Sequence, residues 1–465
     1  MGVRFRTLGF GKNLLTFKVQ SPKSKVQSPM SKVQSPMSLT TPLELNKEFR
    51  DVLDEMEKTK KNLFITGRAG TGKSTLLGLF RSTTRKKCVV LAPTGVAALN
   101  VNGQTIHSFF GFPGKFFGPE EVRRRKDRRI YEKLEVLIID EISMVRADLF
   151  DHIDRFLRMN RANPKPFGGV QVFLFGDMFQ LPPVVSSSEE QFYFQSYYSS
   201  PYFFSAKVFE DGFECNLIEL NKVYRQEARL FIRLLDAVRT GTIDYDDFEE
   251  LNSRHIPNFE TKDDYITLSS RNALVDALNE KELRHLSTPE CLFVAETTGL
   301  FDPKQVQTDA HLRLKLGAQV MFIKNDPKRE FVNGTIGKII RLTALNITVR
   351  INEKGIEKEI EVEKQTWEMI RYVSANEGAN ISTEIIGTFK QYPLRLAWAI
   401  TIHKSQGKTF DKVIIDLGTG AFEVGQTYVA LSRCRTLNGI VLKQPLRNND
   451  VKVDERILDF YQRNS

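Results

Sequence analysis

The sequence predicts an α/β protein with two doubly wound parallel sheets and a small β-barrel inserted into its second half. Short apolar runs typical of buried parallel strands recur along the chain, and helical stretches lie between them. The runs form two sets, at residues 63–66, 88–92, 136–139 and 170–175, and at residues 265–268, 395–401, 412–416 and 439–442. Within residues 320–392, apolar and polar residues alternate instead, and residues 352–355 resemble a hairpin turn.

The composition is that of a globular chain with more than one domain. The chain has 465 residues, of which 41% are hydrophobic and 27% are charged, and domains usually run to about 100–200 residues. No apolar run approaches the ~20 residues that a membrane-spanning helix needs, which argues against an integral membrane protein. The four cysteines are far apart without a CxxC pattern, which argues against a disulfide framework or a cysteine zinc site.

The first 40 residues differ from the rest of the chain. Residues 18–24, 25–31 and 32–38 are near-identical copies of a unit with one proline and one valine, so we expect a disordered basic repeat tail over residues 1–40. The tail has seven basic residues and no acid, so the net charge of +10 falls to +3 for residues 41–465. Its start resembles a mitochondrial transit peptide, and the alternative is an extension without function, with translation starting at Met30 or Met37.

A glycine-rich loop follows the first predicted strand and precedes a predicted helix. Residues 67–74 read Gly-Arg-Ala-Gly-Thr-Gly-Lys-Ser, the pattern of a phosphate-binding loop in the context that it requires. Lys73 would reach the β- and γ-phosphates of a nucleotide, and the Ser74 hydroxyl would bind Mg²⁺. The alternative is a chance glycine turn. The candidate nucleotide-binding residues of this loop are Gly67, Ala69, Gly70, Thr71, Gly72, Lys73, Ser74 and Thr75.

Two further strands of the first set end in polar residues. The strand at residues 136–139 leads into Asp140, a candidate Mg²⁺ ligand, and Glu141, which would polarise the attacking water. The alternative is an acidic strand end that caps the next helix. The strand at residues 170–175 leads to Gln180, whose amide could sense the γ-phosphate, and to the stiff pair Pro182 and Pro183.

Taken together, these motifs resemble superfamily 1 helicases of the B type, and above all the Pif-type (petite integration frequency) DNA helicases. The resemblance continues, in the order of the family, through residues 92–98, 105–110, 223–226, 399–407 and 428–433. It implies two RecA-like P-loop NTPase domains with a small 1B-type insert and an SH3-like β-barrel insertion (2B) in the second domain. The implied boundaries are 41–210 for domain 1A with the 1B insert at about 111–132, 211–320 and 393–450 for domain 2A, 321–392 for domain 2B, and 451–465 for a C-terminal tail.

The resemblance also implies an activity. It is that of an ATP-dependent helicase that uses ATP and Mg²⁺, moves 5′ to 3′ on single-stranded DNA and unwinds tailed duplex DNA, with relatives that act on quadruplexes and in replication, recombination and repair. Arg225 and Arg433 match arginines that contact the γ-phosphate in this family. The expected protein is a monomer, located in the cytoplasm at the nucleoid in a bacterium, or in the nucleus or mitochondrion of a eukaryote. The alternatives are a translocase or recombination motor without strong unwinding, and a non-catalytic nucleic-acid-binding protein with a relic P-loop.

The residues expected to line the DNA path come from the same motifs. Their hydroxyl, amide and backbone groups suit phosphates, and an aromatic ring at Phe110 could stack on a base. For the two histidines a buried, hydrogen-bonded role is the alternative. The candidates are Thr94, Gly95, His107, Ser108, Phe110, Pro182, Thr401, His403, Ser405 and Gln406.

Two other segments carry weaker expectations. Residues 123–129 contain six cations, which fits contact with duplex phosphates, although a solvated charge run explains them equally well. Many relatives read adenine with a glutamine upstream of the P-loop, whereas residues 44–49 contain no glutamine here. Asn46 offers the same amide in that region.

Overall fold

The computed structural model describes residues 46–185, 187–226, 228–260, 264–353, 355–374 and 381–464. The basic tail expected over residues 1–40 lies outside the described residues, as do residues 41–45 at the start of the expected domain 1A. None of the helices in the described ranges combines the length and hydropathy that crossing a bilayer requires.

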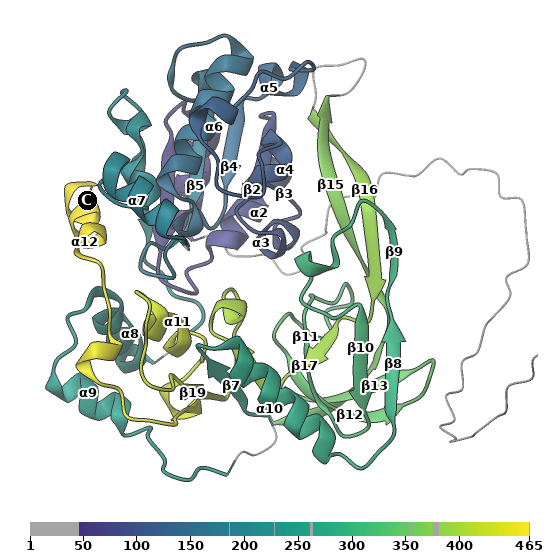
Figure 1. Ribbon diagram of the computed structural model, residues 1–465. Helices are drawn as coiled ribbons and strands as arrows, with labels where there is room; N and C mark the ends of the chain where they lie inside the picture. The colour runs from purple at the N-terminus through teal and green to yellow at the C-terminus, as the bar shows by residue number, and fades with distance from the viewer. Residues whose placement is uncertain are drawn as a thin grey trace, which may run out of the picture. The chain divides into compact units, whose positions relative to one another are not determined.

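The first α/β domain is built on a six-stranded parallel sheet with strand order β3-β2-β4-β5-β1-β6 (Figure 1). Its inner strands are buried along their whole length and mostly apolar, which is why they are recognisable in the sequence. The strands are β1 (Leu63–Gly67), β2 (Cys88–Ala92), β3 (Gln104–Thr105), β4 (Val136–Ile139), β5 (Gln171–Phe175) and β6 (Asn216–Leu220). Because β6 pairs with β1, this sheet extends beyond the boundary expected at residue 210.

Helices cover this sheet through apolar faces. In α1 (Lys47–Lys58), for example, Phe49, Val52 and Met56 are buried at helical spacing. The other helices of this domain are α2 (Lys73–Thr83), α3 (Gly95–Asn100), α4 (Ile106–Phe110), α5 (Arg129–Lys133), α6 (Ala147–Arg161) and α7 (Ser188–Tyr197). Short 3₁₀ helices lie at Pro119–Glu121, Ile142–Met144, Pro166–Gly169, Phe203–Ser205 and Lys207–Phe209.

The second α/β domain has a four-stranded parallel sheet with strand order β18-β7-β19-β20. Its strands are β7 (Ile266–Ser269), β18 (Ala399–Thr401), β19 (Val413–Asp416) and β20 (Ile440–Leu442). Its helices are α8 (Arg229–Thr240), α9 (Tyr245–Asn252), α10 (Asn272–His285) and α11 (Gln426–Leu431), with 3₁₀ helices at His403–Ser405, Leu437–Gly439 and Asn448–Asp450. The two predicted α/β sheets are therefore present.

A set of antiparallel strands is inserted between β7 and β18. A five-stranded sheet of order β14-β13-β12-β11-β17 comprises β11 (Gln319–Phe322), β12 (Ile336–Leu342), β13 (Ile347–Glu353), β14 (Ile356–Val362) and β17 (Leu394–Leu396). Beside it lie a three-stranded sheet of β9 (Glu296–Gly299), β15 (Gln365–Ser374) and β16 (Ile381–Gln391), the pair β8 (Glu290–Val294) and β10 (His311–Lys315), and a 3₁₀ helix at Pro303–Gln305.

The extent of this insertion differs from the expected 321–392. Strands β8, β9 and β10 place its first elements before residue 321. The apolar run at 395–401, expected as one strand of the second α/β sheet, is split, because β17 pairs with β11 in the inserted sheet and only β18 pairs with β7. The sequence could not show this split, because the residues stay mostly apolar on both sides of the point where the chain changes its partner strand.

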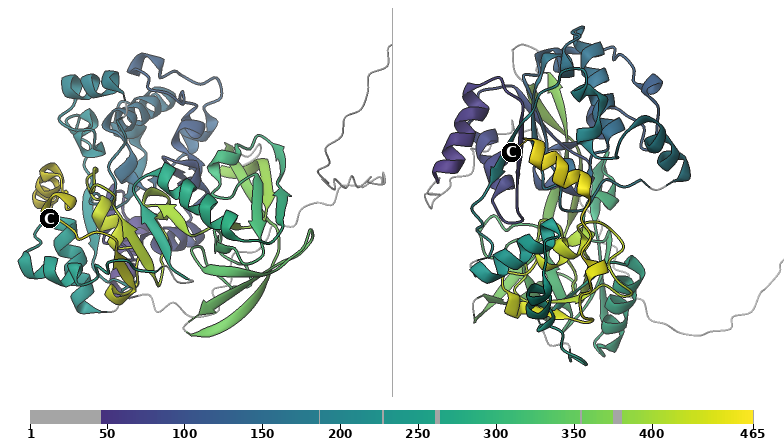
Figure 2. Two further views of the ribbon diagram at one scale, coloured as in Figure 1. Left: turned by 60° about the horizontal axis from the view of Figure 1, so that its bottom comes forward. Right: turned by 90° about the vertical axis from the view of Figure 1, so that its left-hand side faces the viewer.

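The C-terminal segment expected as a tail is a helix, α12 (Glu455–Asn464). It follows the second domain in sequence, yet it packs against the first, where Phe460 contacts Phe64 and Phe203 (Figures 1 and 2). The helix was not predicted from the sequence, because it buries only Ile457 and Tyr461 and therefore has only a short apolar stripe.

Candidate active site

The glycine-rich loop connects β1 to α2, and its backbone conformation explains its glycines. Gly67, Gly70 and Gly72 have φ values of +144°, +87° and +87°, which side chains rarely tolerate. A Cβ atom on Gly70 would also lie 2.5 Å from Cβ of Arg225. Gly72 caps α2, so the loop presents backbone N–H groups at a helix N-terminus, the arrangement that binds phosphate.

Lys73 is held against this loop. Its Nζ atom donates hydrogen bonds to the carbonyl oxygens of Gly67, at 2.6 Å, and Arg68, at 3.1 Å. Burial lowers the pKa of Lys73, while the carboxylates of Asp177 and Glu141 act in the opposite direction. The ammonium group therefore lies beside the backbone that would bind phosphate, among the acids of the neighbouring strand ends.

The acidic pair follows β4 as predicted. Burial, and then the neighbouring Glu141, raise the pKa of Asp140 to about 7, and burial also raises that of Glu141. Glu141 has φ +51°, an uncommon conformation for this residue type that points to local strain at a site. Two neighbouring carboxylates, one buried and one partly buried, are stabilised by a divalent cation, so the donor set of Ser74 and Asp140 fits Mg²⁺ completed by phosphate and water oxygens. In the described part of the chain no three His, Cys, Asp or Glu side chains are grouped as for a protein-only metal site.

Asp177, after β5, is the centre of a buried hydrogen-bond network. Its Oδ2 atom accepts from Gln180 Nε2 at 3.1 Å and from the Tyr428 hydroxyl at 3.2 Å. Its Oδ1 atom accepts from Arg239 Nε and Nη2, both at 3.4 Å. The Tyr428 hydroxyl in turn accepts the backbone N–H of Ala69 at 2.9 Å. The network thus joins the P-loop, the β5 end and two helices of the second domain.

Sequence reasoning assigned no role to Asp177, Arg239 or Tyr428. Asp177 and Tyr428 lie inside motifs that the family shares, and this position could have identified them as functional residues. Arg239 lies in α8, outside every motif.

Arg225 and Arg433 reach the same place from the second half of the chain. Arg433 is 1% exposed, and its hydrogen bonds within the described residues all go to carbonyl or hydroxyl oxygens, among them Val429 O at 2.9 Å and Ser432 Oγ at 2.7 Å. Burial lowers its pKa to about 10. Burial, and then Arg433, lower the pKa of Arg225 to about 9. A buried and a partly buried guanidinium group, each with a lowered pKa, make a site for an added anion.

Asn46 lies next to the loop but has partners of its own. Its Oδ1 atom accepts the Phe49 N–H at 2.7 Å and caps α1, while its Nδ2 atom donates to the Tyr224 hydroxyl at 2.9 Å. Tyr224 is half-exposed, and its N–H donates to Gly70 O at 2.9 Å. Recognition of adenine by Asn46 stays a prediction, since a base would compete with Tyr224 for the amide.

The expected DNA-contacting residues fall into two groups. Ser108 is exposed, and His107, Gly95, Thr94, Pro182, His403 and Gln406 are partly exposed. Thr94 caps α3, Ser108 Oγ accepts from Gln104 Nε2 at 2.8 Å, and His403 Nε2 lies 3.2 Å from Glu423 Oε2. Burial lowers the pKa of His107. The amide Nε2 of Gln406 has no hydrogen-bond partner within the described residues.

Phe110, Thr401 and Ser405 form the second group, and the structure corrects the expectation for them. Phe110 is fully buried and packs on the rings of Phe109 and Phe112 at 4.9 and 5.3 Å, so it cannot stack on a base. Ser405 is also fully buried, and its hydroxyl donates to Ile402 O at 2.6 Å. Thr401 is 4% exposed and accepts the Lys404 N–H. These three side chains therefore stabilise the fold of the motifs and are not part of the surface that DNA could contact.

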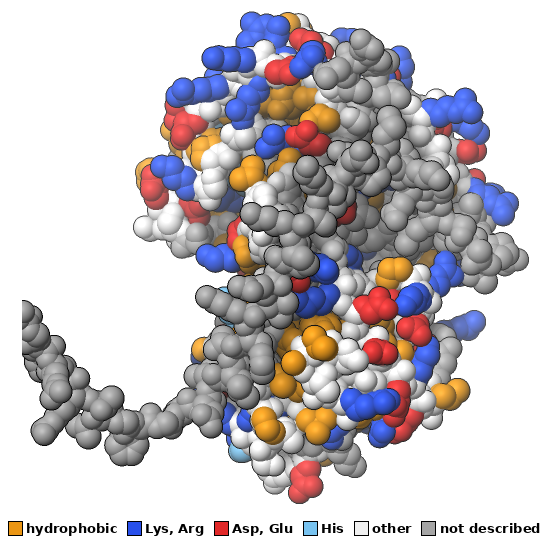
Figure 3. Space-filling view, turned by 90° about the vertical axis from the view of Figure 1, so that its right-hand side faces the viewer, with side chains coloured by type: hydrophobic (Ala, Val, Ile, Leu, Met, Phe, Trp, Pro, Cys, Tyr) orange, Lys and Arg blue, Asp and Glu red, His pale blue; other side chains and the backbone are white. Residues whose placement is uncertain are grey.

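The basic segment at residues 123–129 is divided between structural and exposed roles. Arg125 Nη2 donates to Phe110 O at 2.6 Å, and Arg129 pairs with Asp127. Arg123, Arg124 and Lys126 are exposed and have no ion pair in the described ranges. On the visible parts of the face in Figure 3, Lys and Arg side chains are interspersed with Asp and Glu side chains.

Comparisons with known proteins agree with the order of these motifs. Residues 44–249 match the family model of PIF1-like helicase, and residues 305–342 match that of the DNA helicase Pif1 2B domain. The chain is 34% identical over 434 residues to the ATP-dependent DNA helicase Pif1 of Bdellovibrio bacteriovorus, covering 90% of this chain and 92% of that one. It is 36% identical over 441 residues to human ATP-dependent DNA helicase PIF1, covering 91% of this chain but only 64% of that one.

Solved structures give the same result. A Bacteroides sp Pif1 in complex with ADP-AlF4 is similar with a TM-score of 0.83 and 37% identity, covering 90% of this chain and 96% of that one. Bacteroides Pif1 bound to ssDNA is similar with a TM-score of 0.63, at the same identity and coverage. The two α/β domains are therefore RecA-like, with an inserted 2B domain.

Proposed function

Because this chain belongs to the PIF1-like helicase family and is an ATP-dependent DNA helicase, we propose that it moves 5′ to 3′ along single-stranded DNA and unwinds the duplex ahead. The observation that carries the motor mechanism is the convergence of both RecA-like domains on one site. Lys73, Glu141 and Gln180 come from the first domain, and Arg225 and Arg433 come from the second. Hydrolysis at such a site depends on the relative placement of the two domains.

Each residue has a separate chemical task in this proposal. Lys73 and the loop N–H groups hold the β- and γ-phosphates, and Glu141 orients and deprotonates the attacking water. Gln180 holds that water or senses the γ-phosphate. Ser74 and Asp140 would hold Mg²⁺, which would neutralise charge on the phosphate oxygens.

The two arginines supply charge at the transferring phosphoryl group. An arginine in this role accelerates hydrolysis by about 10³–10⁵ in other NTPases. Arg433 suits it, because it is buried and its hydrogen bonds go to neutral oxygens. The γ-phosphate would then give Arg433 an ionic partner, which none of its hydrogen bonds within the described residues supplies.

The DNA path is proposed to use the exposed and partly exposed motif residues. Phosphate contacts there would come from hydroxyl, amide and backbone groups, which tolerate any base sequence, as a translocase needs. These residues are Thr94, Gly95, His107, Ser108, Pro182, His403 and Gln406. The structure of Bacteroides Pif1 bound to ssDNA supports binding of single-stranded DNA by this chain.

The acting unit, the pathway and the location are proposed more broadly. We take a monomer as the unit, although one related structure is described as DNA unwinding at forked dsDNA by two coordinating Pif1 helicases. Genome maintenance, including unwinding of quadruplex DNA, is the proposed role. The location would be the cytoplasm at the nucleoid in a bacterium, or the nucleus or mitochondrion in a eukaryote.

A direct comparison of substrates tests the proposal. Duplexes with a 5′ tail, a 3′ tail or no tail, and a quadruplex behind a 5′ tail, are unwound with ATP and Mg²⁺. We expect unwinding of the 5′-tailed substrates alone. Equal unwinding of the 3′-tailed duplex would refute the direction, and translocation on single strands without unwinding would favour the motor alternative.

A further inference from the structure

The C-terminal helix α12 touches the ATP site through one residue. The hydroxyl groups of Tyr461 and Thr66 share a buried hydrogen bond of 2.6 Å. Thr66 is the last residue before Gly67, whose carbonyl oxygen accepts from Lys73 Nζ at 2.6 Å. A continuous chain of contacts thus runs from Tyr461 through Thr66 and Gly67 to the lysine that would bind phosphate.

The ring of Tyr461 makes a second contact with the site. It lies 5.0 Å from the ring of Phe179, and the Arg239 guanidinium lies 4.4 Å from Phe179 and 5.9 Å from Tyr461. Arg239 is the group that donates to Asp177. Tyr461 therefore contacts both the strand that enters the P-loop and the segment that carries Gln180.

The path by which the chain reaches α12 is short. On the side of the second domain, the N–H of Gly425, the N-cap of α11, donates to Lys452 O at 3.0 Å. On the side of the first domain, the Tyr202 hydroxyl donates to Asp454 Oδ2 at 3.1 Å. Only Val453 lies between these anchors. A relative movement of the two domains would therefore act directly on α12.

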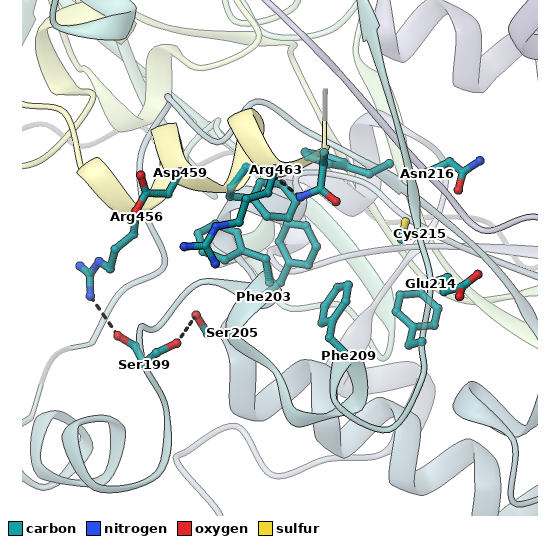
Figure 4. A pocket seen from close by; sticks show the side chains of 15 residues that line it. Ser199, Phe203, Ser205, Phe209, Glu214, Cys215, Asn216, Arg456, Asp459 and Arg463 are labelled. Carbon is teal, nitrogen blue, oxygen red and sulfur yellow. Dashed lines mark hydrogen bonds between the residues drawn. The ribbon is translucent and has the colours of Figure 1, made fainter.

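The packing of α12 leaves space on another face of the helix. A cavity of about 700 Å³ is lined by Arg456, Asp459 and Arg463 of α12 and by Phe203 and Phe209 of the first domain (Figure 4). Ile457 and Tyr461 do not line it and form the buried stripe.

We propose that α12 couples the two RecA-like domains and that its residue Tyr461 is a positioning residue for the ATP site. Its hydroxyl fixes Thr66, and through Thr66 the start of the P-loop. A phenylalanine and a valine would pack equally well here, and a buried hydroxyl pair adds little net stability. The hydrogen bond between the two hydroxyl groups instead fixes the orientation of Thr66, the residue that precedes the P-loop.

The test compares ATP hydrolysis in full-length variants that differ by single hydroxyl groups. Tyr461→Phe and Thr66→Val should each lower kcat about three- to tenfold, because each removes the hydrogen bond that joins the two hydroxyl groups. Thr66→Ser keeps the hydroxyl and should stay within about twofold of the parent chain. Because the two residues act through one bond, the double variant Thr66→Val with Tyr461→Phe should be no slower than either single variant.

Tyr392→Phe is the matched control. It removes another buried tyrosine hydroxyl, which donates to Leu345 O at 2.9 Å in the inserted antiparallel strands and bonds neither α12 nor the P-loop. It should lower the melting temperature as Tyr461→Phe does, while kcat and KM for ATP stay unchanged. An equal loss of kcat in Tyr392→Phe would overturn the proposal, as would a multiplicative double variant or a Thr66→Val variant as fast as Thr66→Ser.

Hydrogen exchange supplies a second measurement that does not depend on a variant. Coupling between two sites is reciprocal, so a nucleotide that orders the P-loop should also slow exchange in α12. We expect slower exchange across Glu455–Asn464 on addition of ADP and aluminium fluoride. Protection of the P-loop without any change in α12 would contradict the proposed coupling between α12 and the ATP site.

Discussion

The Tyr428 hydroxyl donates a hydrogen bond to Asp177 Oδ2 at 3.2 Å and accepts the backbone N–H of Ala69 at 2.9 Å. Tyr428 belongs to α11 of the second domain, Ala69 to the P-loop, and Asp177 to the segment after β5. Burial, and then Asp177, raise the pKa of Tyr428, so the hydroxyl stays protonated and able to donate. One side chain from α11 of the second domain thus links two parts of the first domain, the P-loop and the segment after β5.

Tyr428→Phe should lower ATP turnover about tenfold, because a buried carboxylate and a buried N–H each lose a partner. The packing of the ring is kept, but the unpaired groups should lower the melting temperature as well. Steady-state hydrolysis with single-stranded DNA measures the effect. Tyr245→Phe is the control, since its exposed hydroxyl donates to Glu249 on the same helix, α9, and to no other described residue. If the two variants hydrolysed ATP equally well, the bridge would have no part in turnover.

Lys73→Ala should abolish hydrolysis while leaving appreciable binding of single-stranded DNA. The ammonium group lies against the Gly67 and Arg68 carbonyls of the P-loop, and the substitution leaves the side chains of the proposed DNA path in place. ATP turnover with and without DNA, together with fluorescence anisotropy of a labelled strand, separates the two properties. Substantial DNA-stimulated hydrolysis in this variant would remove the P-loop assignment.

The exposed part of the basic segment gives a third prediction. Replacing Arg123, Arg124 and Lys126 together with alanine should weaken binding of forked DNA and reduce its salt dependence by about one unit of slope per lost phosphate contact. Hydrolysis stimulated by single-stranded DNA should stay unchanged. Arg129→Ala is the control, because Arg129 is paired with Asp127. An unchanged salt slope in the triple variant would show that the segment is a solvated charge run.

The parts of the fold that were predictable share one physical property. Strands β2 and β4 match the predicted runs at 88–92 and 136–139, because buried parallel strands are apolar along their whole length. Strand β6 was missed, because it lies at the sheet edge with Asn216 exposed and has no continuous apolar run. Strand β17 was assigned to the wrong sheet, since apolar residues do not specify their partner.

The same limit applies to the site. Lys73, Asp140 and Gln180 follow strand ends of one sheet, and a motif beside each strand was enough to bring them together. The contribution of Arg239 and Tyr461 depends on how a second domain and a C-terminal helix pack, and no local pattern encodes that. Phe110 shows the converse, because a residue inside a DNA-binding motif can serve the core.

Phe110→Ala should therefore act on stability. Removing a fully buried phenylalanine costs about 3–5 kcal/mol of unfolding free energy, whereas an exposed site usually changes it by less than about 0.5 kcal/mol. Urea unfolding measures the difference, with Phe422→Ala as the control because Phe422 is 59% exposed. A Phe110→Ala variant of parental stability that had lost DNA affinity would restore the stacking role.

His152 gives a prediction about pH. It is 2% exposed between Phe112 and Phe117, and its Nδ1 atom has no hydrogen-bond partner within the described residues. Burial lowers its pKa to about 4, outweighing Asp148, while the cations Arg146 and Arg155 add to the shift. Between pH 4 and 6.5 the unfolded chain therefore binds a proton that the folded protein does not.

Because the unfolded state takes up that proton, the unfolding free energy should fall as the pH drops from 6.5 to 4, by about 3 kcal/mol for this group. His152→Phe keeps an aromatic ring among Phe112 and Phe117 but cannot be protonated, so its loss of stability over this range should be smaller by that amount. Urea unfolding at intervals of half a pH unit measures both curves. The control is His285→Gln, because His285 is exposed on α10 and its replacement should leave the parental curve unchanged. Parallel curves for the parent and His152→Phe would mean that His152 is protonated in the folded protein as readily as in the unfolded chain.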